Sequence, residues 1–363
     1  MSWLKIAVGG HIDHGKSSLV GCLRRFLQKG IFAEGLDKAH ISDTLKAERA
    51  TDRTMALGRS TTSLGNHSFT ILDAPGHLEF LSGFITASAS ADLLILVVDA
   101  RAGFCAQSLL HLKISQMLKP VPVLIYFSKM DEVNWDKSRF DELTQVAKTL
   151  QDSMGFTCLN ILCGSSLSGE GVLSSVVCPH FASHPSLIEV LCNYRGEENN
   201  LIDAPLRILV QGNEGMAYGS LVSGSVQTFQ KVMIFPDGVI DDVLEVSTLG
   251  PSSFWPHPVG IRLGKHILKR GDRICSFDNQ PLPVKKVSAL LMAFSSLALP
   301  LRFLQQTSCI PVKSLSSTQV LEQTKVEISF DSFVHSESDV RLDFLNRGSL
   351  FDGYSIVASL KLN

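Results

Sequence analysis

The sequence has no long hydrophobic run. Its longest apolar stretch, Leu93–Val98, is far shorter than the roughly 20 residues that a membrane-spanning helix needs. The first residues lead directly into an apolar strand pattern and lack the features of a secretion signal. We therefore expect a cytoplasmic protein without a membrane partner.

Cysteine motifs are also absent. The eight cysteines are scattered, and none forms a Cys-x-x-Cys pair or accompanies a histidine cluster. This spacing argues against a zinc site and is typical of buried thiols in a reducing compartment.

A strong charge of one sign is missing as well. The formal net charge is −2, which gives no overall electrostatic reason to expect nucleic acid binding. Hydrophobic residues make up 45% and charged residues 19% of the chain, a composition typical of folded globular proteins. A length of 363 residues is more than one core usually holds, so we expect two or three domains.

The first half of the chain, residues 1–198, alternates between apolar strand patterns and amphipathic helix patterns. This order predicts an α/β domain with a mostly parallel sheet and helices on both faces. The predicted strands are Leu4–Val8, Phe69–Leu72, Leu93–Asp99, Val121–Phe127 and Cys158–Leu162. The predicted helices are Ser17–Leu27, His77–Ala89, Ser108–Leu118 and Phe140–Met154.

The pattern changes after the polar stretch Glu197–Asn200. Short strand patterns separated by Gly, Pro and Asp turns follow it, and this spacing is typical of small β-barrels. A second break near Phe277–Pro283 divides this part into residues 203–280 and a short last domain, residues 281–363. We therefore predict two small β-barrel domains after the α/β domain.

One segment of the first half carries a phosphate-binding pattern. Residues 10–17 read Gly-His-Ile-Asp-His-Gly-Lys-Ser, which fits G-x-x-x-x-G-K-[ST] between a predicted strand and a predicted helix. Backbone N–H groups and the helix N-terminus can bind the phosphates, Lys16 can reach the β- and γ-phosphates, and the Ser17 hydroxyl can ligate Mg²⁺. The predicted nucleotide-binding residues of this loop are Gly10, Asp13, His14, Gly15, Lys16, Ser17 and Ser18.

A second motif, Asp73-Ala74-Pro75-Gly76-His77, directly follows the predicted strand Phe69–Leu72. Asp73 can hold Mg²⁺, the Gly76 N–H can contact the γ-phosphate, and His77 can orient the attacking water. Thr54 can add an oxygen ligand to Mg²⁺. A plain turn and a solvated loop threonine are the alternative interpretations. We assign catalysis to Lys16, Thr54 and His77, and the metal to Ser17, Thr54 and Asp73.

A third motif, Ser128-Lys129-Met130-Asp131, follows the predicted strand Val121–Phe127. The Asp131 carboxylate can accept hydrogen bonds from guanine N1 and N2, which adenine does not offer, so GTP and GDP are the expected ligands. The usual first residue of this motif is Asn, and we expect Ser128 to lose the brace that the longer amide gives the loop. Ser165 and Ser166 can place backbone N–H groups near guanine O6, although a plain Ser/Gly loop explains them almost equally well.

These motifs together resemble the translation-factor superfamily of GTPases. Leu45-Lys46-Ala47-Glu48-Arg49 is similar to elongation factor 1-alpha. Other stretches look closer to the large, GTP-binding subunit of bacterial sulfate adenylyltransferase; they are Gly10–Leu19, Gly76–Leu81, Ala89–Gly103, Gln107, Ser108, His111, Phe235–Gly238, Lys269–Asp272 and Phe351–Val357.

The resemblance implies a GTPase domain followed by two β-barrels, and a protein partner. In the sulfate enzyme this partner is a catalytic subunit that makes adenylyl sulfate from ATP and sulfate, and GTP hydrolysis drives that step. The chain departs from both families at Asp52-Arg53-Thr54-Met55, where they have Gly-Ile-Thr-Ile, and at Phe84 and Ala87, where they usually have Met and Gly.

Three functions stay open on this sequence. The first is a GTPase coupled to sulfate activation through an adenylyltransferase-type subunit. The second is a translation elongation factor of the Tu, 1-alpha or SelB type, with aminoacyl-tRNA and the ribosome as partners. The third is a degenerate GTP-binding module that regulates a partner with little turnover.

Overall fold

A computed structural model shows that the chain folds into two compact units, Met1–Glu197 and Glu198–Asn363. Each unit is described by itself. The structure describes residues 2–29, 58–64, 67–73, 81–176, 178–181, 184–194, 201–248, 257–293, 301–305, 308–315, 323–336, 347–351 and 356–362.

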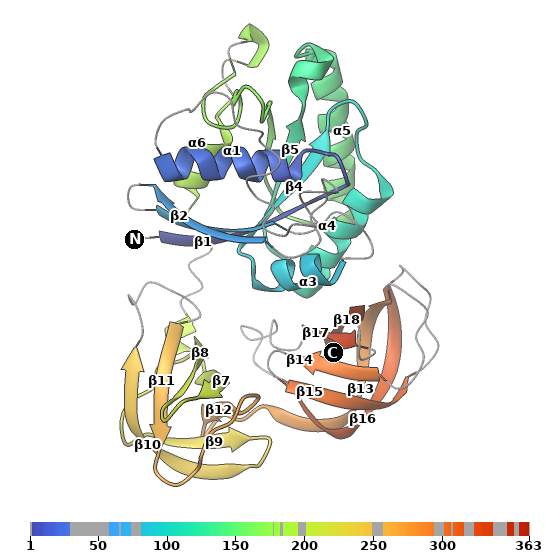
Figure 1. The fold of residues 1–363 in the computed structure, drawn as a ribbon. Coiled ribbons are helices and arrows are strands. Elements are labelled where there is room, and N and C mark those ends of the chain that lie inside the picture. The colour runs from blue at the N-terminus through green and yellow to red at the C-terminus, as the bar shows by residue number, and fades with distance from the viewer. Residues whose placement is uncertain are drawn as a thin grey trace, which may run out of the picture. The chain divides into compact units, whose positions relative to one another are not determined.

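The first unit is built on a six-stranded sheet in the order β2-β3-β1-β4-β5-β6 (Figure 1). Neighbouring strands are parallel except β2, which runs antiparallel to β3 at one edge. The strands are β1 (Ser2–Gly10), β2 (Gly58–Leu64), β3 (His67–Asp73), β4 (Leu93–Asp99), β5 (Val123–Ser128) and β6 (Cys158–Cys163). The predicted α/β fold with a mostly parallel sheet is therefore confirmed.

Helices cover both faces of this sheet, as the alternation of side chains along each strand requires. On one face, Leu4, Ile6 and Val8 of β1 share a core with α1 (Lys16–Lys29) and α6 (Leu187–Asn193). On the other face lie α3 (Leu81–Ser90) and α4 (Ala106–Leu118), which contact each other and β1.

Helix α5 (Lys137–Met154) packs on the same face as α4, since Phe140 contacts Phe127 of β5 with ring centroids 5.8 Å apart. Its first turn is capped by Asp136, whose carboxylate accepts the Ser138 N–H at 2.9 Å. It ends at Gly155, which has the left-handed φ of +68° that favours glycine. The sequence predicted this helix from Phe140, and the Asp136 cap moves its start to Lys137.

The carboxyl ends of the parallel strands meet at one edge of the sheet. Gly10, Asp73, Asp99, Ser128 and Cys163 are the last residues of β1, β3, β4, β5 and β6. This edge is where open α/β sheets bind their ligands. The phosphate loop, the Asp73 motif, the Ser128 motif and the Ser165-Ser166 pair each begin at or just after one of these strand ends.

The second unit contains two closed antiparallel barrels, so the predicted pair of barrels is confirmed. In the first barrel the strands close in the order β10-β11-β8-β7-β12-β9 around a core of buried aliphatic side chains. They are β7 (Arg207–Asn213), β8 (Ala217–Ser223), β9 (Lys231–Phe235), β10 (Val239–Thr248), β11 (His257–Leu263) and β12 (Arg273–Ser276).

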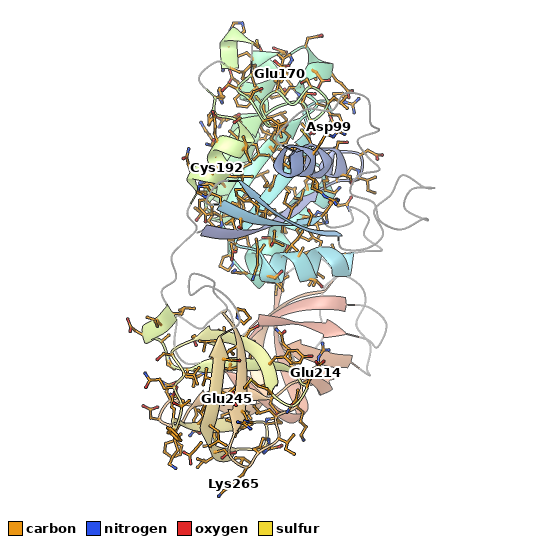
Figure 2. All side chains as sticks on the ribbon, turned by 60° about the vertical axis from the view of Figure 1, so that its left-hand side comes forward. Asp99, Glu170, Cys192, Glu214, Glu245 and Lys265 are labelled. Carbon is orange, nitrogen blue, oxygen red and sulfur yellow. The ribbon has the colours of Figure 1, made fainter. Side chains whose placement is uncertain are left out.

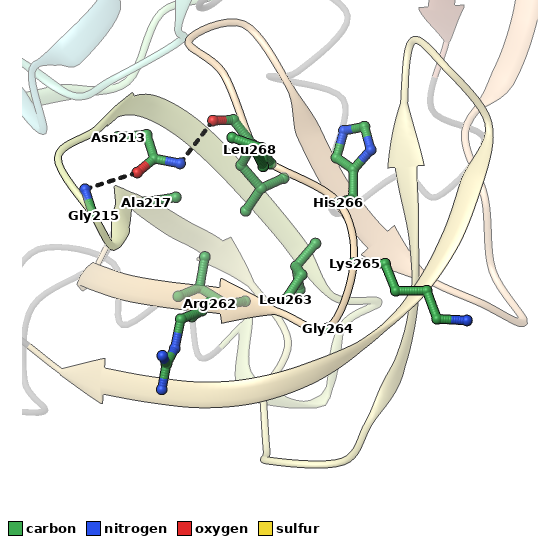
Figure 3. A pocket seen from close by; sticks show the side chains of 11 residues that line it. Asn213, Gly215, Ala217, Arg262, Leu263, Gly264, Lys265, His266 and Leu268 are labelled. Carbon is green, nitrogen blue, oxygen red and sulfur yellow. Dashed lines mark hydrogen bonds between the residues drawn. The ribbon is translucent and has the colours of Figure 1, made fainter.

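The first barrel has a cavity of about 370 Å³ between the β7–β8 turn and the loop after β11 (Figure 3). The Asn213 amide donates to the Leu268 carbonyl at 3.0 Å and its oxygen accepts the Gly215 N–H at 3.1 Å. Beneath the loop after β11, the Asp241 carboxylate accepts the backbone N–H groups of Lys265 and His266 at 2.8 and 2.7 Å. These hydrogen bonds give this end of the barrel a defined shape.

In the second barrel the strands close in the order β13-β16-β15-β14-β17-β18. They are β13 (Leu282–Ala293), β14 (Leu301–Gln305), β15 (Ser308–Leu315), β16 (Gln323–Ser336), β17 (Arg347–Phe351) and β18 (Ile356–Leu362). Both barrels are complete closures, which leave no unpaired strand edge. The exact domain limits, 1–198, 203–280 and 281–363, stay predictions.

Candidate nucleotide-binding site

The phosphate loop connects β1 to α1, and its backbone requires glycine at two positions. Gly10 has φ +141°, and a Cβ atom there would lie 2.3 Å from the Val97 carbonyl oxygen. Gly15 has φ +88°, and Asp13 between them also adopts a positive φ of 59°. Only glycine fits at position 10, so the chain can turn back toward the N-terminus of α1.

Lys16 lies inside this turn. Its ammonium donates to the His11 carbonyl at 2.6 Å, and only 7% of the residue is exposed. Burial lowers the pKa of Lys16 to about 8, although the Asp73 carboxylate opposes this shift. A buried cation held by a loop carbonyl is suited to an anionic ligand, because an anion replaces the water that the ammonium has lost.

Ser128 corrects one expectation from the sequence. Its hydroxyl donates to the His14 carbonyl at 2.6 Å and also lies 3.3 Å from the Val98 carbonyl. The expectation that serine fails to brace the loop was therefore wrong. The shorter side chain reaches the loop because the backbone passes close by: a Cβ on Gly15 would lie only 3.7 Å from the Ser128 oxygen.

We expect Ser128→Ala to weaken GDP binding about tenfold, since a buried carbonyl that loses its donor costs roughly 1–3 kcal/mol. The affinity can be measured by titration with a fluorescent nucleotide. Ser153→Ala is a matched control, because Ser153 is an exposed serine of α5 whose hydroxyl bonds within its own helix. Equal affinities for Ser128→Ala and wild type would show that the hydroxyl does not brace the loop.

Lys129 ties the third motif to both the phosphate loop and β4. It adopts a left-handed conformation with φ 58°, and its ammonium donates to the Asp13 carbonyl at 2.5 Å. The same ammonium pairs with the Asp99 carboxylate at 2.9 Å, and Arg101 also binds Asp99, at 2.7 Å. Figure 2 labels Asp99 in the first unit. Burial would raise the pKa of Asp99, but the hydrogen bonds from Arg101 and Lys129 outweigh it and hold this pKa well below its usual range.

Asp131 lies half-buried in a short 3₁₀ helix, Met130–Val133. The Met130 N–H donates to the Gly164 carbonyl at 3.3 Å, which joins this turn to the loop after β6. Ser165 and Ser166 follow Gly164, and both are buried. The structure thus brings the two predicted base-binding segments together, as guanine recognition requires.

Two of the three predicted magnesium ligands, Ser17 and Asp73, lie among the described residues. Asp73 is the last residue of β3, is 3% exposed, and pairs in register with Val8, two residues before the phosphate loop. Ser17 and Ser18 lie half-buried in the first turn of α1. Thr54, Gly76 and His77 lie outside the described residues, so their assigned roles stay predictions.

The comparison with protein families decides what this site is. The family described as "Elongation factor Tu GTP binding domain" matches residues 1–211. The chain belongs to this family. It is therefore a GTPase of the elongation factor Tu type and binds a guanine nucleotide.

Curated relatives of this GTPase include two kinds of protein. Elongation factor 1-alpha of Methanothermobacter thermautotrophicus is 29% identical over 309 residues, 80% of this chain and 74% of that protein. Sulfate adenylyltransferase subunit 1 of Bacteroides fragilis is 26% identical over 362 residues, 92% of this chain and 75% of that protein. The resemblance to both families that the sequence motifs indicated is thus confirmed.

A solved structure shares the fold. The crystal structure of a bacterial selenocysteine-specific elongation factor, EF-Sec, aligns with a TM-score of 0.59 at 20% identity. The alignment covers the whole of this chain and 58% of that chain. At this identity the likeness concerns the architecture alone.

Sequence reasoning missed several residues around the GTPase site. Asp99 and His111 were noted only as parts of a resemblance, yet Asp99 anchors Lys129 and His111 binds the backbone of the phosphate loop. His14 was assigned to the nucleotide, but its ring nitrogen Nδ1 accepts the Asp99 N–H at 3.2 Å. The available signal was the presence of polar residues, such as Gln107 and His111, inside an otherwise apolar helix.

A pH dependence of stability follows from the burial of His111. The residue is 0% exposed, and burial lowers its pKa to about 3, whereas an unfolded histidine has a pKa near 6.5. Between these values the unfolded chain binds more protons, so stability is lost as the pH falls. We expect this residue to account for about 2 kcal/mol of lost unfolding free energy between pH 7 and pH 5.

Urea denaturation of the nucleotide-free protein at pH 7, 6 and 5 measures this loss. The His111→Asn variant should show a shallower dependence on pH than wild type, because it lacks this titrating ring. Parallel pH dependences in the two proteins would exclude His111 as the source.

Within the part of the chain that the structure describes, no helix is both long and apolar enough to span a membrane.

Proposed function

We propose that the chain binds Mg²⁺·GTP at the phosphate loop, hydrolyses it to GDP, and passes this cycle to a protein partner in the cytoplasm. The observation that supports this most strongly is the closed set of contacts around the loop. Lys16 lies inside it, Ser128 and Lys129 bind it from the base side, and His111 binds its first residue, Gly10.

The residues present fit a magnesium ion. Ser17 offers a hydroxyl and Asp73 a carboxylate, both oxygen ligands of the kind that Mg²⁺ prefers. Among the described residues no group of three or more His, Cys, Asp or Glu side chains could hold a metal without a ligand. This agrees with Mg²⁺, which is usually bound by one or two side chains together with substrate phosphates. When bound, it would neutralise charge on the β- and γ-phosphates.

The proposed hydrolysis assigns one task to each residue of the chain. The phosphate loop and Lys16 hold the β- and γ-phosphates, Gly76 contacts the γ-phosphate, and His77 orients the attacking water. Thr54 adds an oxygen to the metal. Asp131, with the loop after β6, selects guanine.

We expect His77→Ala to leave nucleotide binding intact and to lower turnover roughly 10²–10⁴-fold, the usual effect of losing a group that positions the attacking water. Single-turnover hydrolysis of GTP, with the affinity measured in parallel, tests this. Unchanged turnover would show that another residue orients the water.

The partner that we propose is an adenylyltransferase-type catalytic subunit. The similarity to sulfate adenylyltransferase subunit 1 of Bacteroides fragilis supports this, because it extends over 92% of the chain, whereas the similarity to elongation factor 1-alpha covers 80%. The similarity to the sulfate adenylyltransferase subunit therefore extends over more of the chain. Hydrolysis of GTP would then drive the formation of adenylyl sulfate from ATP and sulfate.

Translation is the second candidate, because elongation factor 1-alpha of Methanothermobacter thermautotrophicus has the higher identity, 29%. Purification of the chain from its native cell with GDP or a non-hydrolysable GTP analogue separates the two. An associated subunit that forms adenylyl sulfate in a GTP-dependent manner supports the first function, and associated aminoacyl-tRNA or ribosomes support the second.

The same preparation tests a regulatory module with little turnover. Single-turnover hydrolysis no faster than that of GTP in buffer, with and without the purified partner, would favour this third function over the other two.

A further inference from the structure

The last two residues of β1 contact two helices of the same face at once. Gly9 lies against Phe84 of α3, and Gly10 is hydrogen-bonded to His111 of α4. One contact lies immediately before the phosphate loop and the other at its first residue, Gly10. Neither Phe84 nor His111 is among the residues assigned to the phosphates, the metal or the base.

The contact at Gly9 depends on the missing side chain. A Cβ atom there would lie 2.8 Å from the Phe84 ring and 3.3 Å from Leu94. The Phe84 ring is fully buried, so α3 rests directly on the backbone of β1. Any larger residue at position 9 would push α3 outward.

The contact at Gly10 is a buried hydrogen bond. The Gly10 N–H donates to Nδ1 of His111 at 3.0 Å, which places the ring proton on Nε2. Burial lowers the pKa of His111 to about 3, so the ring stays neutral and keeps this lone pair available. The N–H at the start of the phosphate loop is therefore fixed by a side chain 101 residues away.

The two side chains also contact each other. The rings of Phe84 and His111 are stacked, with centroids 4.0 Å apart and planes 17° apart. A chain of direct contacts thus runs from the Gly10 amide through His111 and Phe84 to α3. In sequence, α3 begins at Leu81, four residues after His77.

We propose that Phe84 and His111 are a pair of positioning residues that couples helix α3 to the phosphate loop. This inference rests on the proposed function, because it assumes that the loop holds a nucleotide. Neither residue touches the nucleotide. The acceptor on His111 sets the loop, and the stacked rings transmit the position of the loop to the helix that follows His77.

Four substitutions separate these contributions. His111→Phe keeps a ring for stacking but removes the acceptor for the Gly10 N–H. His111→Asn keeps an acceptor near the position of Nδ1 but removes the ring. Phe84→Ala removes the stack from the other side, and Phe84→Met refills that space without an aromatic ring.

Each variant is compared with wild type, as the full chain, in three measurements: nucleotide affinity, single-turnover GTP hydrolysis, and amide hydrogen exchange in residues 81–90. His111→Phe should weaken the binding of GDP and GTP about tenfold. His111→Asn and Phe84→Ala should leave GDP affinity within about threefold, slow hydrolysis about tenfold, and remove most of the protection of α3 that nucleotide binding produces. Phe84→Met should restore hydrolysis to within about threefold of wild type.

The double variant Phe84→Ala/His111→Asn tests the pairing directly. Because the two side chains act through one contact, the double variant should be no slower than either single variant. Leu112→Ala is the matched control, since Leu112 is a fully buried residue of α4 next to His111. It should lower stability by a similar amount without changing α3 protection.

Several outcomes would overturn the coupling. These are independent, additive losses in the double variant, an effect no greater than that of Leu112→Ala, or unchanged α3 protection in His111→Asn. If Phe84→Ala does not fold, the contrast between His111→Phe and His111→Asn decides the question. GTP binding by the wild-type chain is measured first, and its absence would overturn the proposed function. Normal binding by wild type together with unchanged behaviour of the variants would overturn only the coupling.

Discussion

Lys16→Ala is expected to abolish nucleotide binding, raising the Kd for GDP and GTP by at least about 10³-fold. The Lys16 ammonium is buried inside the phosphate loop and donates to the His11 carbonyl at 2.6 Å. Alanine removes the positive charge that faces the phosphates in a site with little water, where charge interactions are strong. Titration with a fluorescent nucleotide measures the loss.

The stability of the empty variant provides a second, independent result. Burial of the Lys16 ammonium opposes its charged form, since it lowers the pKa to about 8. Alanine relieves this cost, so the nucleotide-free variant should unfold no more easily than wild type. Lys148→Ala removes one charge from an exposed position on α5 and serves as the control. Intact GTP affinity in Lys16→Ala would refute the assignment of the site.

Asp131→Asn is expected to change the ratio of GTP to XTP affinity about 10⁴-fold in favour of XTP. In the proposed role, the carboxylate accepts hydrogen bonds from the N1 and N2 groups of guanine, and XTP has a carbonyl in place of the N2 amine. The asparagine amide offers a donor where that carbonyl lies. GTP then leaves buried polar groups unpaired, which is the reason for so large an effect.

The position of Asp131 makes this a local test. Its turn is held by Lys129 against Asp99 and by Met130 against Gly164, and the substitution keeps the shape of the side chain. Binding of GTP and XTP to both proteins measures the ratio. Asp141→Asn, an exposed residue of α5 paired with Lys137, should leave the preference unchanged. Unaltered guanine selectivity in Asp131→Asn would contradict the role assigned to this residue.

Local sequence patterns predicted the parts of this protein that depend on neighbours in the chain. The phosphate loop follows from residues 10–17, and the parallel strands follow from continuous apolar runs such as Leu93–Asp99. The β9–β10 hairpin follows from the turn residues Pro236-Asp237-Gly238, where Gly238 has a positive φ of 67° that favours glycine. In each case the information lies within a few residues.

The parts that could not be predicted depend on distant pairs. Strand β2 reads Gly-Arg-Ser-Thr-Thr-Ser-Leu and lacks the alternation of apolar and polar residues that would predict a strand. Its pairing with β3 at the edge of the sheet holds it in place instead. The brace from Ser128 to His14 spans 114 positions. Whether a serine side chain is long enough to form this hydrogen bond could not be predicted from the residue type, since it depends on how closely the two loops approach each other.

The ties between the two nucleotide loops also bear on how a bound nucleotide leaves. Ser128 and Lys129 bind the His14 and Asp13 carbonyls, so the segment assigned to the base and the segment assigned to the phosphates are joined at two adjacent peptide groups. A distortion of either segment is therefore transmitted to the other. A protein that accelerates nucleotide release would therefore need to displace only one of the two segments. Lys129 is partly exposed whereas Lys16 is buried, so such a protein could act on the Lys129 segment without contacting Lys16.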